Sequence, residues 1–229
     1  LDTDLARPKF AIMNPEITYT LPDYQTQCGC ADIMMHTMER YFVLEDTMEI
    51  TDKIAQDVMK NVMKYAKILK KDPENYEARA EIMWCGSLSH NGLTGCGTCG
   101  GDWATHLMEH ELGGMFDVAH GAGLAAVWGS WARYVMDEKP ERFAQFAVDV
   151  MGVEESDDVK STALKGIEAV EEFYRMIEMP TNMKELGINP TDEQIKDMAM
   201  KATNHDTQQL GAFKKLSAKD LVEIYKTGK

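Results

Sequence analysis

Hydrophobic residues recur along most of the chain at the three- and four-residue spacing of amphipathic helices, and rarely in the alternation of half-buried strands. A short extended segment, residues 7–26, comes first and is interrupted by prolines. The spacing then predicts a helix over residues 30–44. Thr51 is expected to cap a second helix over residues 52–71. A third is predicted over residues 73–92, which start on a proline and end on a glycine.

The second half of the chain continues the helical pattern. Asp102 or Thr105 is expected to cap the next helix, and Gly121 and Gly123 are expected to end it, because glycine weakens helices. Further helices are predicted at residues 124–137, 140–150, 157–178, 181–186, 191–203 and 217–226.

The last of these helices carries its own start signal. Ser217 is followed three residues later by Asp220, a variant of the capping box. No pair of strands joined by hairpin residues is found anywhere. The sequence therefore predicts a single all-α, multi-helical domain over residues 1–229, with many of its 17 methionines filling the core.

Charge and composition then exclude several classes of partner. A net charge of −14 would repel phosphate backbones and anionic lipids, so neither a nucleic acid nor a membrane is expected as a partner. No apolar run reaches the roughly 18 residues of a membrane span. The five cysteines, an odd number, suit a reducing cytoplasm better than secretion.

Histidines and one aspartate form the candidate chemistry. Asp32 and His36 stand four residues apart on a predicted helix, so both side chains leave the same face. His106 and His110 repeat that relation, and His120 follows beside a glycine. A carboxylate with several neutral imidazoles suits Zn²⁺ or Fe²⁺. Histidines that merely line a packed helix are the alternative.

Other titratable residues receive simpler interpretations. His90 and His205 are expected to be surface or capping residues. Glu109 and Glu111 flank His110 but point to other helix faces, so we expect them to be solvated.

The cysteines allow a second kind of site. Cys28-x-Cys30 and Cys96-x-x-Cys99 would provide the four sulfurs of a zinc or iron–sulfur centre, or a redox disulfide. Free thiols are the simpler expectation, because the C-x-C spacing is not typical of such centres.

Four segments carry a family resemblance. They are PKFAIMNPEITYTLP, ADIMMHTMERY, GGDWATHLMEHELGGMFDVAHGAGLA and FKKLSAKDLVEIYK. In this order and spacing they resemble the C-terminal half of the iron-containing alcohol dehydrogenase family, and GGDWATH resembles its butanol dehydrogenase branch. The resemblance implies the helical fold shared with the C-terminal domains of dehydroquinate synthase and glycerol dehydrogenase.

The same resemblance implies roles for particular residues. Asp32, His36, His106 and His120 match the four metal ligands of the family, and the ion would be Fe²⁺ or Zn²⁺. His110 matches a histidine near the nicotinamide and the metal. It is our candidate for proton relay, with a stacking role as the alternative.

The resemblance also implies a partner domain. The family binds NAD(H) or NADP(H) mainly through an N-terminal α/β domain with a glycine-rich phosphate loop. Here GCGTCGG and GAGLAA follow no predicted strand and lack the G-x-G-x-x-G pattern. We expect this chain to be the metal-binding domain alone, inactive without the nucleotide-binding domain in cis. The family also suggests a homodimer.

The expected activity belongs to that intact parent. It is hydride transfer between a primary, butanol-like alcohol and its aldehyde, with the metal as Lewis acid. A non-catalytic metal- or thiol-binding helical module is the alternative. A phosphate-eliminating lyase of the same fold is disfavoured, because residues 28–36 contain no Lys or Arg to hold phosphate.

Overall fold

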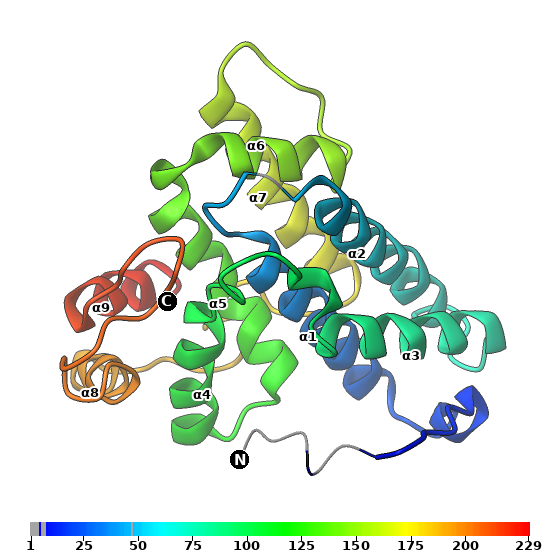
Figure 1. The fold of residues 1–229 in the computed structure, drawn as a ribbon. Helices are drawn as coiled ribbons and strands as arrows, with labels where there is room; N and C mark the ends of the chain where they lie inside the picture. Colours follow the sequence, from blue (N-terminus) through cyan, green and yellow to red (C-terminus); the bar gives the residue numbers. More distant parts are fainter. Residues whose placement is uncertain (1–4, 6–7, 47) are drawn as a thin grey trace.

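The computed structural model describes residues 5, 8–46 and 48–229, so the first residue of the predicted N-terminal segment lies outside the described part. The prediction of an all-α fold is confirmed: within those residues the only β pairing is an isolated bridge between Leu210 and Leu216. The α-helices are α1 (Asp23–Tyr41), α2 (Glu49–Leu69), α3 (Tyr76–His90), α4 (Ala104–Phe116), α5 (His120–Val135), α6 (Pro140–Asp149), α7 (Val159–Met176), α8 (Asp192–Ala202) and α9 (Ala218–Thr227) (Figure 1). Short 3-10 turns are η2 (Pro15–Thr18), η3 (Leu93–Gly95) and η4 (Met136–Glu138).

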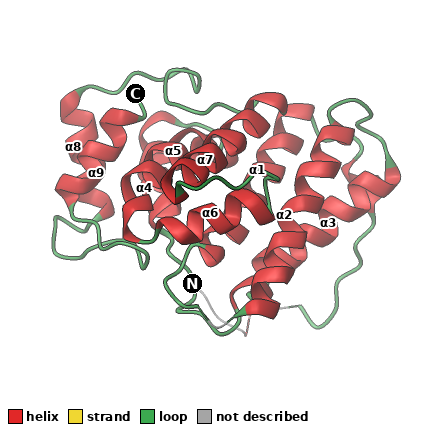
Figure 2. Ribbon diagram, turned by 90° about the horizontal axis from the view of Figure 1, so that it is seen from above, coloured by secondary structure: helices red, strands yellow, loops and turns green. Residues whose placement is uncertain are grey.

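The helices surround α1, which packs against α2, α3 and α5. In Figure 2, α2 and α3 lie at one end of the molecule and α8 and α9 at the other, with α4 to α7 between them. The pairs α6 with α7 and α8 with α9 pack side by side. Among the described residues, none of the helices is long and apolar enough to cross a membrane.

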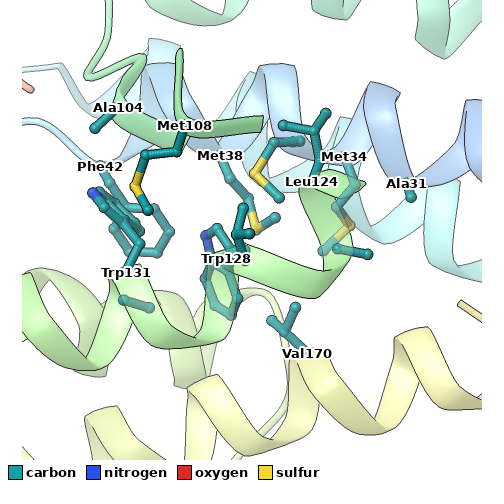
Figure 3. Close-up of a cluster of buried hydrophobic side chains, with 14 of the residues drawn as sticks. Ala31, Met34, Met38, Phe42, Ala104, Met108, Leu124, Trp128, Trp131 and Val170 are labelled. Atoms are coloured by element: carbon teal, nitrogen blue, oxygen red, sulfur yellow. The ribbon is translucent and has the colours of Figure 1, made fainter. Parts of the chain in front are cut away.

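The core is built around sulfur-containing and aromatic side chains. Met34 and Met38 of α1 face Trp128 of α5, and Met108 of α4 lies beside Trp131 (Figure 3). All five side chains are buried. Flexible thioether chains fill irregular gaps between helices, so the prediction that many methionines serve the core holds for these positions.

Several helix boundaries differ from the prediction because tertiary contacts set them. α2 begins at Glu49, which places Thr51 inside the first turn. There its hydroxyl donates to the carbonyl of Cys96 at 2.9 Å and caps nothing. α3 is capped by Asn75, whose side chain accepts from the N–H of Ala78, so the prediction of a start at the proline was wrong.

The segment 181–186 was predicted to be helical and is a series of turns. Glu185 accepts hydrogen bonds from the backbone N–H and the hydroxyl of Thr181, and the N–H of Met183 donates to Gly228. These bonds satisfy the backbone without a helix. By contrast, the predicted capping box at Ser217 is present, as is one at Thr191.

Gly121 and Gly123 do not end a helix, contrary to the prediction. α4 ends earlier, at Phe116, and is followed by the C-cap residue Asp117, whose φ of 52° lies in the left-handed region, while α5 begins at His120. A Cβ atom on Gly121 would lie 2.0 Å from the carbonyl oxygen of Cys28, and one on Gly123 would lie 2.6 Å from the carboxylate of Glu109. Both glycines therefore serve close packing of α5 against α1 and α4.

This packing generates a prediction. Gly121→Ala should destabilise the protein by about 3 kcal/mol, because the added methyl group meets a backbone atom that cannot move aside. The matched control is Gly114→Ala in α4, where a Cβ atom meets nothing within 4 Å. That change should stabilise the fold by about 0.5–1 kcal/mol through helix propensity.

Urea unfolding followed by circular dichroism measures both free energies. Equal free energies of unfolding for the Gly121 and Gly114 variants would contradict this prediction, since they would show that α5 can move away from Cys28 of α1 without loss of stability.

Candidate metal centre

The four residues predicted as metal ligands meet where α1, α4 and α5 converge. Asp32 and His36 lie on α1, His106 lies in the first turn of α4, and His120 is the first residue of α5. The Oδ1 atom of Asp32 lies 3.6 Å from Nε2 of His36, 3.7 Å from Nε2 of His106 and 3.5 Å from Nε2 of His120. The structure thus brings all four side chains together around one carboxylate oxygen.

These distances fit a bound cation. Ligands held about 2.0–2.2 Å from a tetrahedral metal stand about 3.3–3.6 Å from one another, and the three distances from Oδ1 of Asp32 are close to this range. The Oδ1 atom of Asp32 and the Nε2 atom of His106 are buried, with no hydrogen-bond partner in the described part of the chain. Donor atoms of Asp32, His36 and His106 all lie within 4.8 Å of one another. Buried unpaired donors of this kind suit zinc or iron.

A buried carboxylate that the sequence reasoning missed holds His106 in place. Glu39 is 2% exposed, and its Oε1 atom accepts hydrogen bonds from the backbone N–H of His106 and from the ring Nδ1 of the same residue, both at 3.1 Å. Its Oε2 atom accepts from the backbone N–H of Trp103 at 2.7 Å. The Nδ1 bond fixes the ring so that Nε2 faces Asp32.

Glu109 plays the same part for His120. The expectation that Glu109 is solvated was wrong: its side chain is buried and contacts Nδ1 of His120. α5 turns back over α4 at this point, which sequence spacing alone does not show.

A signal for Glu39 was present in the sequence. Asp32, His36 and Glu39 recur at intervals of four and three residues, so they share one face of α1. A carboxylate on the same face as two candidate ligands is the partner that a ligating imidazole commonly uses.

The electrostatics of the centre favour a cation. Burial would raise the pKa of Asp32, but the surrounding imidazoles, first that of His106, hold it well below its usual range. Burial lowers the pKa of His36 to about 3, so this ring is neutral. Burial acts in the same direction on His106, but Asp32 and Glu39 outweigh it and raise the pKa to about 9. A cation would displace that proton.

His110 lies at the rim of the centre. It is exposed on α4, and its ring centroid lies 5.5 Å from that of His120 and 6.5 Å from that of His106. Donor atoms of Glu109, His110 and His120 also lie within 4.8 Å of one another. His110 therefore lies next to the centre, beside the ring of His120.

Trp103 and Arg40 form one wall of the site. Trp103 lies edge-on to the rings of His36 and His106, at centroid distances of 5.3 and 5.1 Å. The Arg40 guanidinium stands 4.7 Å from the Trp103 ring centroid and donates to the carbonyl of Ser89. This wall joins α1, α3 and the start of α4.

Asp102 anchors the start of α4, but the N-cap residue is Trp103, so the prediction that Asp102 or Thr105 caps this helix was wrong. Its carboxylate accepts from the N–H of Ala104 at 3.1 Å, in the first turn of the helix. It also accepts from the N–H groups of Ala212 and Phe213, both at 2.7 Å. Thr105, the other predicted cap, lies inside the helix.

Of the two histidines expected at the surface, one belongs to the centre. His205 is exposed in the turn after α8, as predicted. The Nδ1 atom of His90 lies 2.9 Å from the carbonyl oxygen of Gly86, as a capping residue would. However, its Nε2 atom lies 3.5 Å from Oδ2 of Asp32, and its ring stacks on His36 with centroids 3.8 Å apart. His90 is therefore exposed, as predicted, but it also lies against the centre, which the prediction did not foresee.

All five cysteines are free thiols. Cys28, Cys30 and Cys85 are buried, whereas Cys96 and Cys99 are exposed on the loop before α4. Within the described residues, no cluster of three or more metal-binding side chains includes a cysteine. In the described part of the chain, the donor atoms that lie close enough together to hold a metal thus come from imidazoles and carboxylates, and not from thiols.

Comparisons with known proteins identify the family of this chain. Residues 26–228 match the family described as the Fe-containing alcohol dehydrogenase family, C-terminal. The chain is 34% identical over 224 residues to NADH-dependent butanol dehydrogenase A of Clostridium acetobutylicum, covering 97% of this chain and 57% of that protein. It is 33% identical over 206 residues to the NADPH-dependent aldehyde reductase YqhD of Escherichia coli, covering 90% and 52%.

A solved structure shows the same fold. The crystal structure of NADH-dependent butanol dehydrogenase A from Thermotoga maritima superposes with a TM-score of 0.91 at 33% identity, over 100% of this chain and 58% of that one. The chain thus spans slightly more than half the length of these relatives. The family resemblance of the four sequence segments is confirmed, and the chain belongs to the iron-containing alcohol dehydrogenase family, matching its C-terminal helical part.

Proposed function

We propose that this chain supplies the metal-binding half of an alcohol dehydrogenase that uses NADH or NADPH to interconvert a small primary alcohol and its aldehyde. The observation that carries the proposal is the convergence of three imidazole Nε2 atoms on one oxygen of Asp32, with buried carboxylates behind two of the rings. The relatives named as butanol dehydrogenase and aldehyde reductase support the substrate class.

Asp32, His36, His106 and His120 would hold the ion, either iron or zinc, since this donor set suits both and availability decides between them. When bound, the ion supplies Lewis acidity at the oxygen of the alcohol or aldehyde. Asp32 balances its charge.

The neighbouring residues orient the donors and handle the proton. Glu39 and Glu109 keep the rings of His106 and His120 turned toward Asp32. Trp103 excludes water from one side of the centre. An imidazole nitrogen of His110 takes the proton of the alcohol and returns it to the alkoxide in the reverse direction.

The nicotinamide cofactor belongs to the rest of the longer protein, as does one wall of the substrate site. A homodimer is part of the same proposal, and the free thiols favour the cytoplasm as its location. A non-catalytic metal-binding module is the alternative. It would bind the ion in the full-length protein without oxidising NADH or NADPH in the presence of an aldehyde.

Metal content is the first test. Protein purified anaerobically should contain about one iron or zinc per chain, measured by elemental analysis. The double variant His106→Ala, His120→Ala should lose it, because two of the four donors are gone. The matched control is His205→Asn, which changes an exposed histidine in a left-handed turn that asparagine tolerates. Metal retained by the double variant would place the site elsewhere in the chain.

The two buried carboxylates give a second prediction. Glu39→Gln and Glu109→Gln should each weaken metal binding by about 10- to 100-fold. The neutral amide would hold the ring of His106 or His120 less firmly in the orientation that presents Nε2 to Asp32. The control is Glu111→Gln, the same change of charge on the same helix as Glu109, which makes no hydrogen bond or ion pair with a histidine of the described residues. Competition with a chelator measures the dissociation constants. Equal losses in all three variants would indicate a general effect of charge.

His110 gives a third prediction. In the full-length protein, His110→Asn should lower kcat by about 100- to 10,000-fold and flatten the dependence of kcat on pH, while metal content stays unchanged. Steady-state kinetics across a pH series, with elemental analysis of the same samples, measures both. A change in KM with kcat intact would show that His110 stacks against the substrate or cofactor and transfers no proton.

A further inference from the structure

His90 lies against the centre, although the family resemblance gives it no role. It is the last residue of α3, and its ring stacks on that of His36 at 3.8 Å with an interplanar angle of 33°. Its Nε2 atom lies 3.5 Å from Oδ2 of Asp32. That separation equals the one between Oδ1 of Asp32 and Nε2 of His120.

The other ring nitrogen of His90 shows which atom carries the proton. Nδ1 lies 2.9 Å from the carbonyl oxygen of Gly86 and 2.7 Å from the hydroxyl of Ser89. A carbonyl oxygen only accepts, so the hydrogen of the neutral ring belongs on Nδ1. This leaves a lone pair on Nε2, facing a carboxylate oxygen that also only accepts. While the ring is neutral, two such acceptors at 3.5 Å repel one another unless a metal ion or an added proton lies between them.

His90 shares this arrangement with His106 and His120. In each of the three rings Nδ1 is bound to an oxygen, from Gly86, Glu39 and Glu109 respectively, and Nε2 faces Asp32. Histidines that bind metals nearly always donate their second nitrogen in this way. By this criterion His90 is better prepared to bind than His36, whose Nδ1 is buried without a hydrogen-bond partner in the described part of the chain.

We propose that His90 is a fifth protein ligand of the centre, binding the cation through Nε2 while Asp32 uses both of its carboxylate oxygens. This inference rests on the proposed function. His90 approaches from α3, so the centre draws on four helices and not on three. The His90 side chain is 42% exposed, against 6% for that of His106, which places this ligand on the open side of the centre.

Cobalt substitution tests the assignment without measuring turnover. In Co²⁺-loaded full-length protein, each ligating imidazole contributes one exchangeable, paramagnetically shifted N–H signal to the proton spectrum. The wild type should show one signal more than His36, His106 and His120 account for. His90→Phe, which keeps a ring to stack on His36, should lose one signal and bind Co²⁺ about tenfold more weakly or worse. His90→Gln serves as a second variant, and His205→Asn should match the wild type.

The outcomes separate the two proposals. Protein that binds Co²⁺ with the same signals and the same affinity in the wild type and in both His90 variants overturns the role of His90 alone. Protein that binds no Co²⁺ overturns the proposed function, and this inference with it.

Discussion

The centre depends on one buried carboxylate, that of Glu39, because it joins α1 to α4 at the first turn of α4. Its two oxygens accept from the N–H groups of Trp103 and His106, and its backbone carbonyl accepts from the N–H of Asp102 at 2.9 Å. These are N–H groups at a helix start, which lack intrahelical partners and attract negative charge. The side chain of Glu39 thus provides hydrogen-bond acceptors for the free N–H groups at the start of α4 and also orients the ring of His106.

A second constraint, the absence of side chains, brings α5 to the same place. Gly121 lets the first turn of α5 lie against the carbonyl of Cys28 on α1, and Gly123 leaves room for the carboxylate of Glu109. His120 stands beside both glycines, so its Nε2 atom reaches Asp32. Its Nδ1 atom is at the same time bound to Glu109. Charge and space thus act together: the carboxylates of Glu39 and Glu109 orient two of the rings, and the two glycines let α5 approach closely enough to bring one of those rings in.

The sequence predicted features whose causes are local. The capping box at Ser217 and the shared helix face of Asp32 and His36 depend on residues within one or two turns, and both are present. Predictions from the sequence failed where contacts between distant segments determine the structure. Glu109 was expected to be solvated, but α5 packs back over α4 and buries it. Thr51 failed as a cap for the same reason, because its hydroxyl bonds to the loop before α4. The set of four ligands came from family resemblance, since spacing alone cannot show that two distant helices meet.

The convergence of these helices also links the fold to the supply of metal. His36 and His106 are separated by about 70 residues, a loop that an unfolded chain rarely closes by chance. A cation would therefore bind the folded chain and hardly the unfolded one, so stability rises with the logarithm of free metal concentration. If the proposed ion binds, more chains would open locally and become substrates for proteases when iron and zinc are scarce. The abundance of this protein would then follow the metal status of its cell.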